Sequence, residues 1–173
     1  FKADKLFGFL HPDGSVAIKA VFRNATDFVS GVAGAKTDKG WGLIDKTGRW
    51  IATPEYIQLW YAGSGLFAVE ANSGYGYITM EGIPKTNLDY QMIHEFKEGL
   101  ASYQRDELWG YIDIQGNEVT RPHFGLAWPF CEGKARVIFF EGMGYIDRQG
   151  NPLITPSFID ASDFSEGLAR VPM

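Results

Sequence analysis

Short apolar runs of four to six residues alternate along the chain with clusters of Gly, Pro and Asp. These runs are rich in aromatic and β-branched residues, as in Trp50–Thr53 and Trp109–Ile112. Runs of this kind, bounded by turn residues, predict β-strands, because an amphipathic helix needs apolar residues at i, i+3, i+4 and i+7. Three recurring glycine positions would each cost a helix about 1 kcal/mol. The pattern therefore predicts an all-β protein.

The pattern returns every 34 residues without insertion or deletion. The stretch Trp109–Asp113 has close copies that begin at Trp41 and Met143, and weaker copies that begin at Phe7 and Tyr75. Such fixed spacing indicates tandem repeats, and the strand pattern excludes the helix pairs of tetratricopeptide repeats, which share the period. We expect one domain over residues 1–173, with repeat units 7–40, 41–74, 75–108, 109–142 and 143–173.

Each unit is expected to be a small antiparallel meander. The strand with Trp-Gly leads into an Asp-x-x-Gly turn, as at Asp113–Gly116, where the Asp side chain accepts hydrogen bonds from the turn backbone. The next strand, as in Trp50–Thr53, is expected to stop at Pro54. An irregular segment then leads to a Glu-Gly turn and a closing strand, as in Phe164–Val171.

One meander of this size cannot bury its apolar face, so the units must stack. Two columns of apolar residues spaced by 34 are expected to line the shared core: Leu10, Ile44, Ile78, Ile112 and Ile146, and then Phe22, Tyr56, Tyr90, Phe124 and Phe158. The units could form an open, solenoid-like array or a closed five-bladed ring, in which the chain ends complete one blade. We favour the open array, because common propeller blades need roughly 40–45 residues.

Composition narrows the classes of partner. The net charge is −5 with a pI near 5.2 and mixed signs, which argues against nucleic acid. No apolar run approaches the roughly 18 residues of a membrane span, so no membrane insertion is expected. The single cysteine, Cys131, excludes an internal disulfide. Because the sequence starts at Phe1 without Met, we expect a fragment of a longer chain.

Residues suited to catalysis or metal binding do not form a known motif. His11, His94 and His123 lack the close spacing of a zinc site. There is no phosphate-binding loop, nucleophile elbow or metalloprotease helix. Carboxylates such as Asp113 or Glu132 could serve a hydrolase, but they recur in several units, as turn residues do and as an active site need not. We therefore expect no cofactor, no metal and no catalytic residue.

Binding residues are expected in columns where the units differ. One column reads Thr26, Trp60, His94, Trp128 and Ser162. Stacking of consecutive units would bring Trp60, His94 and Trp128 into an aromatic ladder, with Tyr61 beside it. Aromatic faces suit both sugar rings and protein side chains. The alternative is that the two tryptophans fill gaps between repeats.

A second variable position is the loop before each Trp-Gly strand. It is polar in three units but reads Ile138-Phe139-Phe140-Glu141 in the fourth. We expect Phe139 and Phe140 to contact another chain or another domain. The alternative is a longer strand packed under its neighbour.

Trp109-Gly110-Tyr111-Ile112-Asp113, together with the preceding Phe96-x-Glu98-Gly99-Leu100-Ala101, resembles the bacterial WG-repeat family along the whole chain. The resemblance implies β-rich repeats in binding or scaffold modules, and it implies no catalytic residue. We expect a non-catalytic module that presents a repeat surface to a protein partner or to other domains of a longer chain. A carbohydrate- or cell-wall-binding module that uses the aromatic column is the alternative, and a hydrolase is a third.

Overall fold

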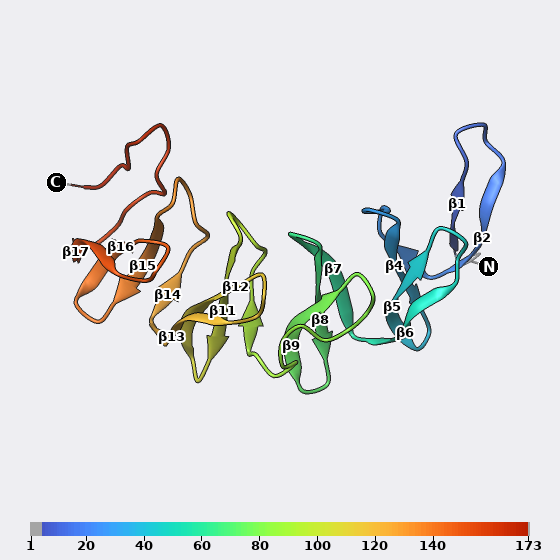
Figure 1. Cartoon of the computed structure of the whole chain (residues 1–173), viewed down its shortest axis with the longest axis horizontal. Coiled ribbons are helices and arrows are strands. Elements are labelled where there is room, and N and C mark those ends of the chain that lie inside the picture. Colours follow the sequence, from blue (N-terminus) through green and yellow to red (C-terminus); the bar gives the residue numbers. More distant parts are fainter. Residues whose placement is uncertain (1–4, 173) are drawn as a thin grey trace. The chain divides into compact units, whose positions relative to one another are not determined.

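The computed structural model describes residues 5–172, so the first four residues and Met173 of the expected domain lie outside the described part. Every regular element in this part is a β-strand, and Figure 1 shows the strands grouped into small sheets in chain order. The chain divides into two compact parts. The first contains the chain up to Tyr61 together with Gly65–Asp89, and the second contains Ala62–Ser64 together with the chain from Tyr90 onward. Below, "first unit" and "second unit" mean these two parts, and the 34-residue units are called repeats. The predicted all-β class is confirmed.

Three antiparallel sheets lie in the first part of the chain. The first sheet has two strands, β1 (Phe7–Leu10) and β2 (Val16–Phe22). The second has four strands in the order β3 (Asn24–Ala25), β4 (Val32–Thr37), β5 (Gly40–Asp45) and β6 (Trp50–Tyr56). The third has β7 (Gln58–Gly63), β8 (Leu66–Ala71) and β9 (Gly74–Thr79). Neighbouring strands are consecutive in the chain, so each sheet is a meander.

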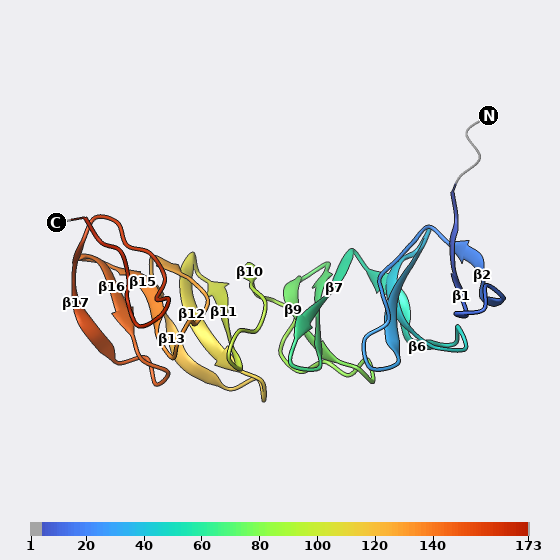
Figure 2. The same cartoon turned by 90° about the horizontal axis from the view of Figure 1, so that it is seen from above.

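Two four-stranded sheets follow in the second unit. One contains β10 (Met92–Ile93), β11 (Leu100–Arg105), β12 (Leu108–Asp113) and β13 (Glu118–Phe124). The other contains β14 (Leu126–Ala127), β15 (Ala135–Phe139), β16 (Gly142–Ile146) and β17 (Pro152–Phe158), of which Figure 2 shows the last three side by side. Within residues 5–172 none of the five sheets closes on itself, which agrees with the predicted open array of repeats.

Each four-stranded sheet combines the end of one 34-residue unit with the start of the next. In the sheet β10–β13 the boundary between two 34-residue repeats falls at the start of β12, directly after Leu108. The segment before the Glu-Gly turn, expected to be irregular, is instead a short strand in this sheet, because Met92 and Ile93 pair with Gln104 and Tyr103 of β11. The same correction applies to β3, β7 and β14.

The strand after the Asp turn does not end at its proline, so that expectation is wrong. Strand β13 continues through Pro122 to Phe124, and β6 and β17 behave alike. Trp109 pairs with Phe124 and Tyr111 pairs with Thr120, so the register shifts between these pairs. Pro122 lies in this bulge on an edge strand. Its missing amide hydrogen therefore removes no hydrogen bond between the strands.

The same bulge explains the glycine of Trp-Gly. A Cβ on Gly110 would lie 2.6 Å from the carbonyl oxygen of Thr120 and 3.0 Å from the nitrogen of Pro122. On Gly42 of β5 it would lie 2.4 Å from the carbonyl oxygen of Ala52. The backbone of the edge strand therefore approaches too closely for any side chain at this position, as the recurrence of glycine predicted.

Four members of the first predicted core column are fully buried: Ile44, Ile78, Ile112 and Ile146. In the second column, Phe22, Tyr56, Tyr90 and Phe124 are buried and Phe158 is half-buried. The prediction is wrong for Leu10, which is exposed. Among the described residues its strand, β1, pairs with β2 alone, so no strand covers its other side.

Consecutive sheets within a unit share a core. In the first unit one cluster joins Leu43 of β5 with Phe67 of β8 and Ile78 of β9. In the second unit another joins Tyr111 of β12 with Ile146 of β16. Each cluster draws side chains from two sheets, which is how these small meanders bury the apolar face that none could bury alone.

Candidate functional site

The recurring aspartates build turns, as predicted. Asp147 Oδ1 accepts hydrogen bonds from the amides of Gln149 at 2.9 Å and Asn151 at 2.8 Å, and the Gly150 amide donates to the Asp147 carbonyl at 3.0 Å. The Asn151 side-chain amide donates to Asp147 Oδ2, and these bonds hold the pKa of Asp147 below its usual value. Asp45 and Asp113 bind their own turns in the same way.

The two repeats that lack this aspartate keep the turn with a substitute acceptor. In the third repeat, Thr79 Oγ1 accepts from the amides of Glu81 at 3.2 Å and Ile83 at 3.3 Å. In the first repeat, Asp13 Oδ1 accepts from the Ser15 amide at 2.9 Å, while His11 occupies the usual aspartate position. The departures from the sequence pattern therefore change the acceptor and leave the turn in place.

The Glu-Gly turns connect one repeat to the next. Glu98, Glu132 and Glu166 have φ of 52°, 51° and 53°, and the glycine after each also has positive φ. Two such residues in a two-residue hairpin loop form a type I′ turn. Glu98 Oε2 accepts from the Gly133 amide at 3.0 Å, and Glu132 Oε2 accepts from the Gly167 amide at 2.9 Å. The sequence pattern indicated a turn residue but gave no sign of this link.

A cation strengthens the link at Glu98. Arg148 Nη1 lies 3.3 Å from Glu98 Oε2, and Arg148 Nη2 donates to the Glu98 carbonyl at 2.6 Å. Arg148 follows the aspartate of the fifth Trp-Gly strand, so it reaches back two repeats. The ring centre of Phe130 lies 6.0 Å from its guanidinium carbon. Glu98 thus joins three consecutive repeats.

The first members of the aromatic column lie on β7. The Trp60 ring packs edge-to-face on Tyr75, with ring centres 6.4 Å apart. The Tyr61 ring packs on Phe67 at 5.5 Å, and its hydroxyl accepts from the Gly65 amide at 3.1 Å. Both side chains are half-buried. Tyr61 therefore supports the turn that follows it, in addition to any binding role.

The other two members lie in the second unit. The imidazole of His94 stacks on Trp109, with ring centres 4.7 Å apart and planes 8° apart, and His94 Nδ1 lies 2.8 Å from Ser102 Oγ. Burial lowers the pKa of His94, which keeps the ring neutral at pH 7. The guanidinium carbon of Arg136 lies 4.2 Å from the ring centre of Trp128.

All three rings contact their own sheet: Trp60 contacts β9, His94 contacts β12 and Trp128 contacts β15. Four members of the column also make the same backbone hydrogen bond: the amide of each donates to the carbonyl of the residue eight positions later. These four are Thr26, His94, Trp128 and Ser162. This column therefore helps to hold each member's segment on the following closing strand. The aromatic ladder along successive repeats stays a prediction.

The paired phenylalanines have different environments. Phe139 is the last residue of β15, not part of a loop as expected, and it packs edge-to-face on Phe124 at 5.4 Å. Phe140 lies in the following turn and is fully exposed. A longer strand therefore accounts for Phe139, whereas Phe140 has the exposure that a contact residue needs.

Two more exposed apolar side chains lie at the same end of this sheet as Phe140. Leu126 pairs with Ile138, two residues before Phe140. Ile159 directly follows β17, whose last residue pairs with the start of β16. We call Leu126, Phe140 and Ile159 the tip cluster. Sequence analysis missed the two aliphatic members, because isolated Leu and Ile residues are common on protein surfaces.

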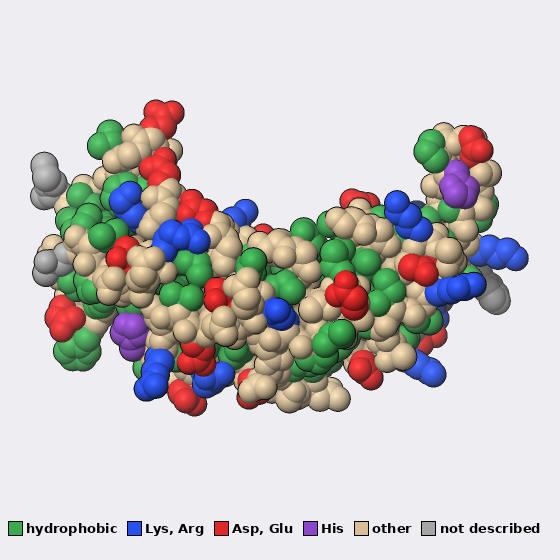
Figure 3. Space-filling model, viewed as in Figure 1, with side chains coloured by type: hydrophobic (Ala, Val, Ile, Leu, Met, Phe, Trp, Pro, Cys, Tyr) green, Lys and Arg blue, Asp and Glu red, His purple; other side chains and the backbone are tan. Residues whose placement is uncertain are grey.

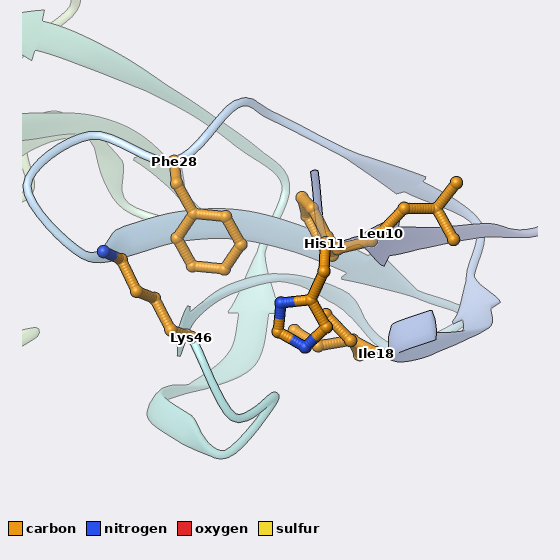
Figure 4. A pocket seen from close by; sticks show the side chains of 7 residues that line it. Leu10, His11, Ile18, Phe28 and Lys46 are labelled. Atoms are coloured by element: carbon orange, nitrogen blue, oxygen red, sulfur yellow. The ribbon is translucent and has the colours of Figure 1, made fainter. Parts of the chain in front are cut away.

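A pocket of about 190 Å³ opens in the first unit, lined mainly by apolar side chains: Phe9, Leu10, His11, Ala17, Ile18, Phe28 and Lys46. Phe9 and Phe28 pack edge-to-face at 4.7 Å. Figure 4 shows Phe28, Lys46 and His11 around the opening, and Figure 3 shows apolar side chains and a histidine at the surface over β1 and β2. Sequence analysis did not predict this pocket.

The described residues offer little metal or thiol chemistry. No three His, Cys, Asp or Glu side chains in residues 5–172 lie together as a metal site requires. Burial, helped by nearby carboxylates such as Asp163, raises the pKa of the Cys131 thiol, so the reactive thiolate is scarce at pH 7. In the same part of the chain, no helix is long and apolar enough to cross a membrane.

Comparison with known proteins identifies the family. The chain is similar to the extracellular domain of the putative hybrid two component system BT3049 from B. thetaiotaomicron, with 12% identity and a TM-score of 0.38, over 85% of this chain and 23% of that chain. No curated protein matches it significantly. The family model described as "WG containing repeat" matches residues 7–40, 41–75, 75–109, 109–138 and 143–171. The chain therefore belongs to the WG-repeat family.

Proposed function

We propose that this chain is a non-catalytic binding module for a protein partner, and that the tip cluster is one of its contact surfaces. The observation that carries the proposal is the complete exposure of Phe140 in the β15–β16 turn. The corresponding turns of the sister repeats carry polar residues: Asp38-Lys39, Asn72-Ser73 and Asp106-Glu107. An aromatic side chain that is exposed where its counterparts are polar is a typical anchor for a partner.

The hairpin presents Phe140 in a fixed position. Phe139 anchors the end of β15 on Phe124, and β15 pairs with β16 up to the residues that flank the turn. A rigid anchor loses little conformational entropy on binding. Burying one phenylalanine side chain stabilises a complex by about 1.5–3 kcal/mol. Leu126 and Ile159 are further exposed apolar side chains at the same end of this sheet.

The aromatic column offers a sugar only part of its ring surface. One face of His94 lies on Trp109 and one face of Trp128 lies under Arg136, so each of these rings has at most one open face for stacking. The exposed parts of Trp60, His94, Trp128 and Tyr61 stay available as additional protein contacts in this proposal.

The carboxylates support a non-catalytic role. Asp113 Oδ1 accepts from the amides of Gln115 and Asn117, and Glu132 Oε2 accepts from the amide of Gly167. These bonds orient both carboxylates toward the backbone, and those of Asp113 help to hold its pKa below the usual value, whereas a general acid must hold a proton and aim it at a substrate.

The experiment places a photo-crosslinking phenylalanine analogue at position 140 and, as a matched control, at the exposed apolar Ile83. The tagged chain is irradiated in a protein extract of the cells that produce it. We expect a crosslinked polypeptide of defined mass from position 140, absent from position 83 and lost with Leu126→Asp and Ile159→Asp. Equal crosslinking at both positions, or none at 140, would overturn the proposal.

A second measurement separates the sugar alternative. Cell-wall oligosaccharides are titrated against the chain while tryptophan fluorescence is recorded. We expect no saturable change. A saturable change that Trp60→Ala and Trp128→Ala abolish would assign the aromatic column to carbohydrate instead.

A further inference from the structure

The two sheets of the second unit meet at the end that carries two of their hairpin turns. Gly125 alone separates β13 from β14, and Phe139 of β15 packs on Phe124, the last residue of β13. Phe124 pairs with Trp109, close after the β11–β12 turn, and β14 pairs with β15 close before the β15–β16 turn. Both turns therefore lie at the same end of the second unit, which we call the turn end.

Each of these two turns places a carboxylate beside an exposed apolar side chain. Glu107 precedes Leu108 in the first turn, and Glu141 follows Phe140 in the second. All four side chains are exposed. The first turn is exposed although a complete sheet follows it in the chain, so a neighbouring sheet does not cover the turn end.

Two further apolar side chains are exposed at the turn end. Met92 begins β10 and Leu126 begins β14, at equivalent positions of successive repeats. The same position holds polar residues in the first unit, Asn24 and Gln58. The turn end thus differs from its counterparts in two ways, because it has both more apolar side chains and more carboxylates.

The carboxylates of the turn end have no cation of their own. Asp106, Glu107 and Glu141 form no ion pair with another residue in the range 5–172. Arg105 is next to Asp106 in the chain, but its Nη1 lies 2.8 Å from Glu118 Oε1 and its guanidinium lies over two tyrosine rings. Its charge is therefore already used inside the sheet.

The net charge of the protein also comes from this part of the chain. Residues 90–173 hold seven Lys and Arg against twelve Asp and Glu, whereas residues 1–89 hold nine of each kind. In the first unit, the aspartate of the β4–β5 turn is neutralised, because Asp38 pairs with Arg23 at 2.8 Å. The exposed Arg121 on β13 offsets at most one of the three carboxylates. The turn end is therefore an acidic surface with apolar side chains in it.

We propose that the partner docks on the turn end through a basic segment. An apolar side chain of this segment contacts Phe140, and flanking Lys or Arg side chains pair with Asp106, Glu107 and Glu141. The inference rests on the proposed function and names the chemistry of its partner. Apolar contacts hold such a complex together, while opposite charges at its rim speed association. The same carboxylates repel nucleic acids and anionic lipid surfaces, so a basic protein segment is the occupant that fits.

The first test requires no knowledge of the partner. Random dodecapeptides displayed on phage are selected on the intact chain, and binders that also retain the Phe140→Asp chain are discarded. We expect the enriched peptides to carry a net positive charge, with an aromatic or large aliphatic residue flanked by Lys or Arg. Enrichment of uncharged or acidic peptides, or no enrichment at all, would overturn the inference.

The second test separates the charges from the apolar anchor by binding kinetics. A synthetic copy of the most enriched peptide is passed over the immobilised chain. We expect Glu141→Lys to slow association about threefold or more and Phe140→Ala to speed dissociation about tenfold or more. The matched control is Glu95→Lys, which reverses an exposed charge of the same unit between β10 and the Glu98-Gly99 turn. Equal effects of Glu95→Lys and Glu141→Lys would overturn the role of the turn end.

Salt provides the third test, because it screens exposed charges. The parent is compared with a chain that carries Asp106→Asn, Glu107→Asn and Glu141→Gln. Asparagine suits positions 106 and 107, since both residues have positive φ. Between about 0.05 M and 0.5 M salt, association of the peptide should slow much more with the parent than with the neutralised chain. The same salt dependence in both chains would overturn the inference.

Crosslinking at position 140 distinguishes this inference from the proposed function. Mass spectrometry of the crosslinked partner locates the attached segment, which we expect to contain Lys or Arg within a few residues of the crosslink. A crosslinked partner whose segment is uncharged or acidic would overturn the basic segment and leave the proposed function in place. The absence of any crosslink at position 140 would overturn both.

Discussion

The carboxylate of Glu132 accepts a hydrogen bond from the backbone amide of Gly167, 35 residues later in the chain, at 2.9 Å. Glu132 has a φ of 51°, a left-handed conformation that costs a residue with a side chain about 1–2 kcal/mol. Glu98 makes the same bond to Gly133. The strained turn of one repeat is thus stabilised by the next repeat, so polar contacts as well as the apolar core join the repeats of the second unit.

Removing this bond should loosen the second unit. We expect Glu132→Ala to lower the free energy of unfolding by about 1 kcal/mol, because the Gly167 amide loses its acceptor. The measurement is urea unfolding followed by tryptophan fluorescence. Glu166→Ala is the matched control, since it removes a glutamate from the same turn position and φ. Equal losses of stability in the two variants would contradict the prediction.

The glycine of Trp-Gly should tolerate no side chain. We expect Gly110→Ala to destabilise the second unit by about 1–3 kcal/mol, because its Cβ would lie 2.6 Å from the Thr120 carbonyl oxygen. Gly125→Ala is the control, since its Cβ would have its nearest contact at an ordinary 3.4 Å, with Ile138. Thermal unfolding by circular dichroism compares the two. A Gly125 variant as unstable as the Gly110 variant would show that the close approach is not the cause.

The repeating part of the fold was predictable from sequence. The short apolar runs predicted the all-β class, and the 34-residue spacing predicted the repeat boundaries. Asp147 and its counterparts indicated their turns, because a short acceptor before Gly has few other roles. The bulge at Pro122 was missed, since proline usually ends a strand and only an edge strand can continue through it.

The candidate site was less predictable, because it depends on contacts between repeats. Phe139 and Phe140 look alike in sequence, yet one ends β15 on Phe124 and the other is exposed in the turn. Leu10 fits its column, yet it is exposed, and within residues 5–172 its strand β1 pairs with β2 alone. Sequence periodicity identifies equivalent positions, but it does not say which of them has a neighbour.

The partly buried His94 should make stability depend on pH near neutrality. Burial against Trp109 lowers the pKa of His94 below its ordinary value of about 6.5. The unfolded chain therefore takes up a proton before the folded chain does. Stability is complete above pH 6.5 and declines as the pH falls from there toward the lowered pKa.

Urea unfolding at pH 7.5, 6.5 and 5.5 checks this expectation. His94→Gln should be less stable at pH 7.5, because it loses the stacked ring, but its stability should change less between pH 7.5 and 5.5 than that of the parent chain. His123→Gln serves as the control, since His123 is exposed, and should keep the pH dependence of the parent. A His94 variant with the parent's pH dependence would contradict the assignment.

The turn aspartates should affect stability in a separate, acidic range. The Asn151 side chain, followed by the turn amides, holds the pKa of Asp147 below its usual value near 3.9. The stabilisation is present above that value and is lost as the pH falls through the lowered pKa, because the protonated carboxyl is a poorer acceptor. Asp147→Asn should therefore be less stable at pH 7 and lose less stability between pH 5 and pH 2.

Asn151→Ala provides the graded comparison for this turn. It removes the side-chain donor to Asp147 Oδ2 but keeps the two backbone amides on Oδ1. We expect Asn151→Ala to have a stability at pH 7 between that of the parent and that of Asp147→Asn. Its loss of stability on acidification should also lie between theirs, and thermal unfolding measures both quantities. An Asp147→Asn chain with the parent's melting temperature at pH 7 would remove the turn explanation, and the recurring aspartates would then need a role outside folding.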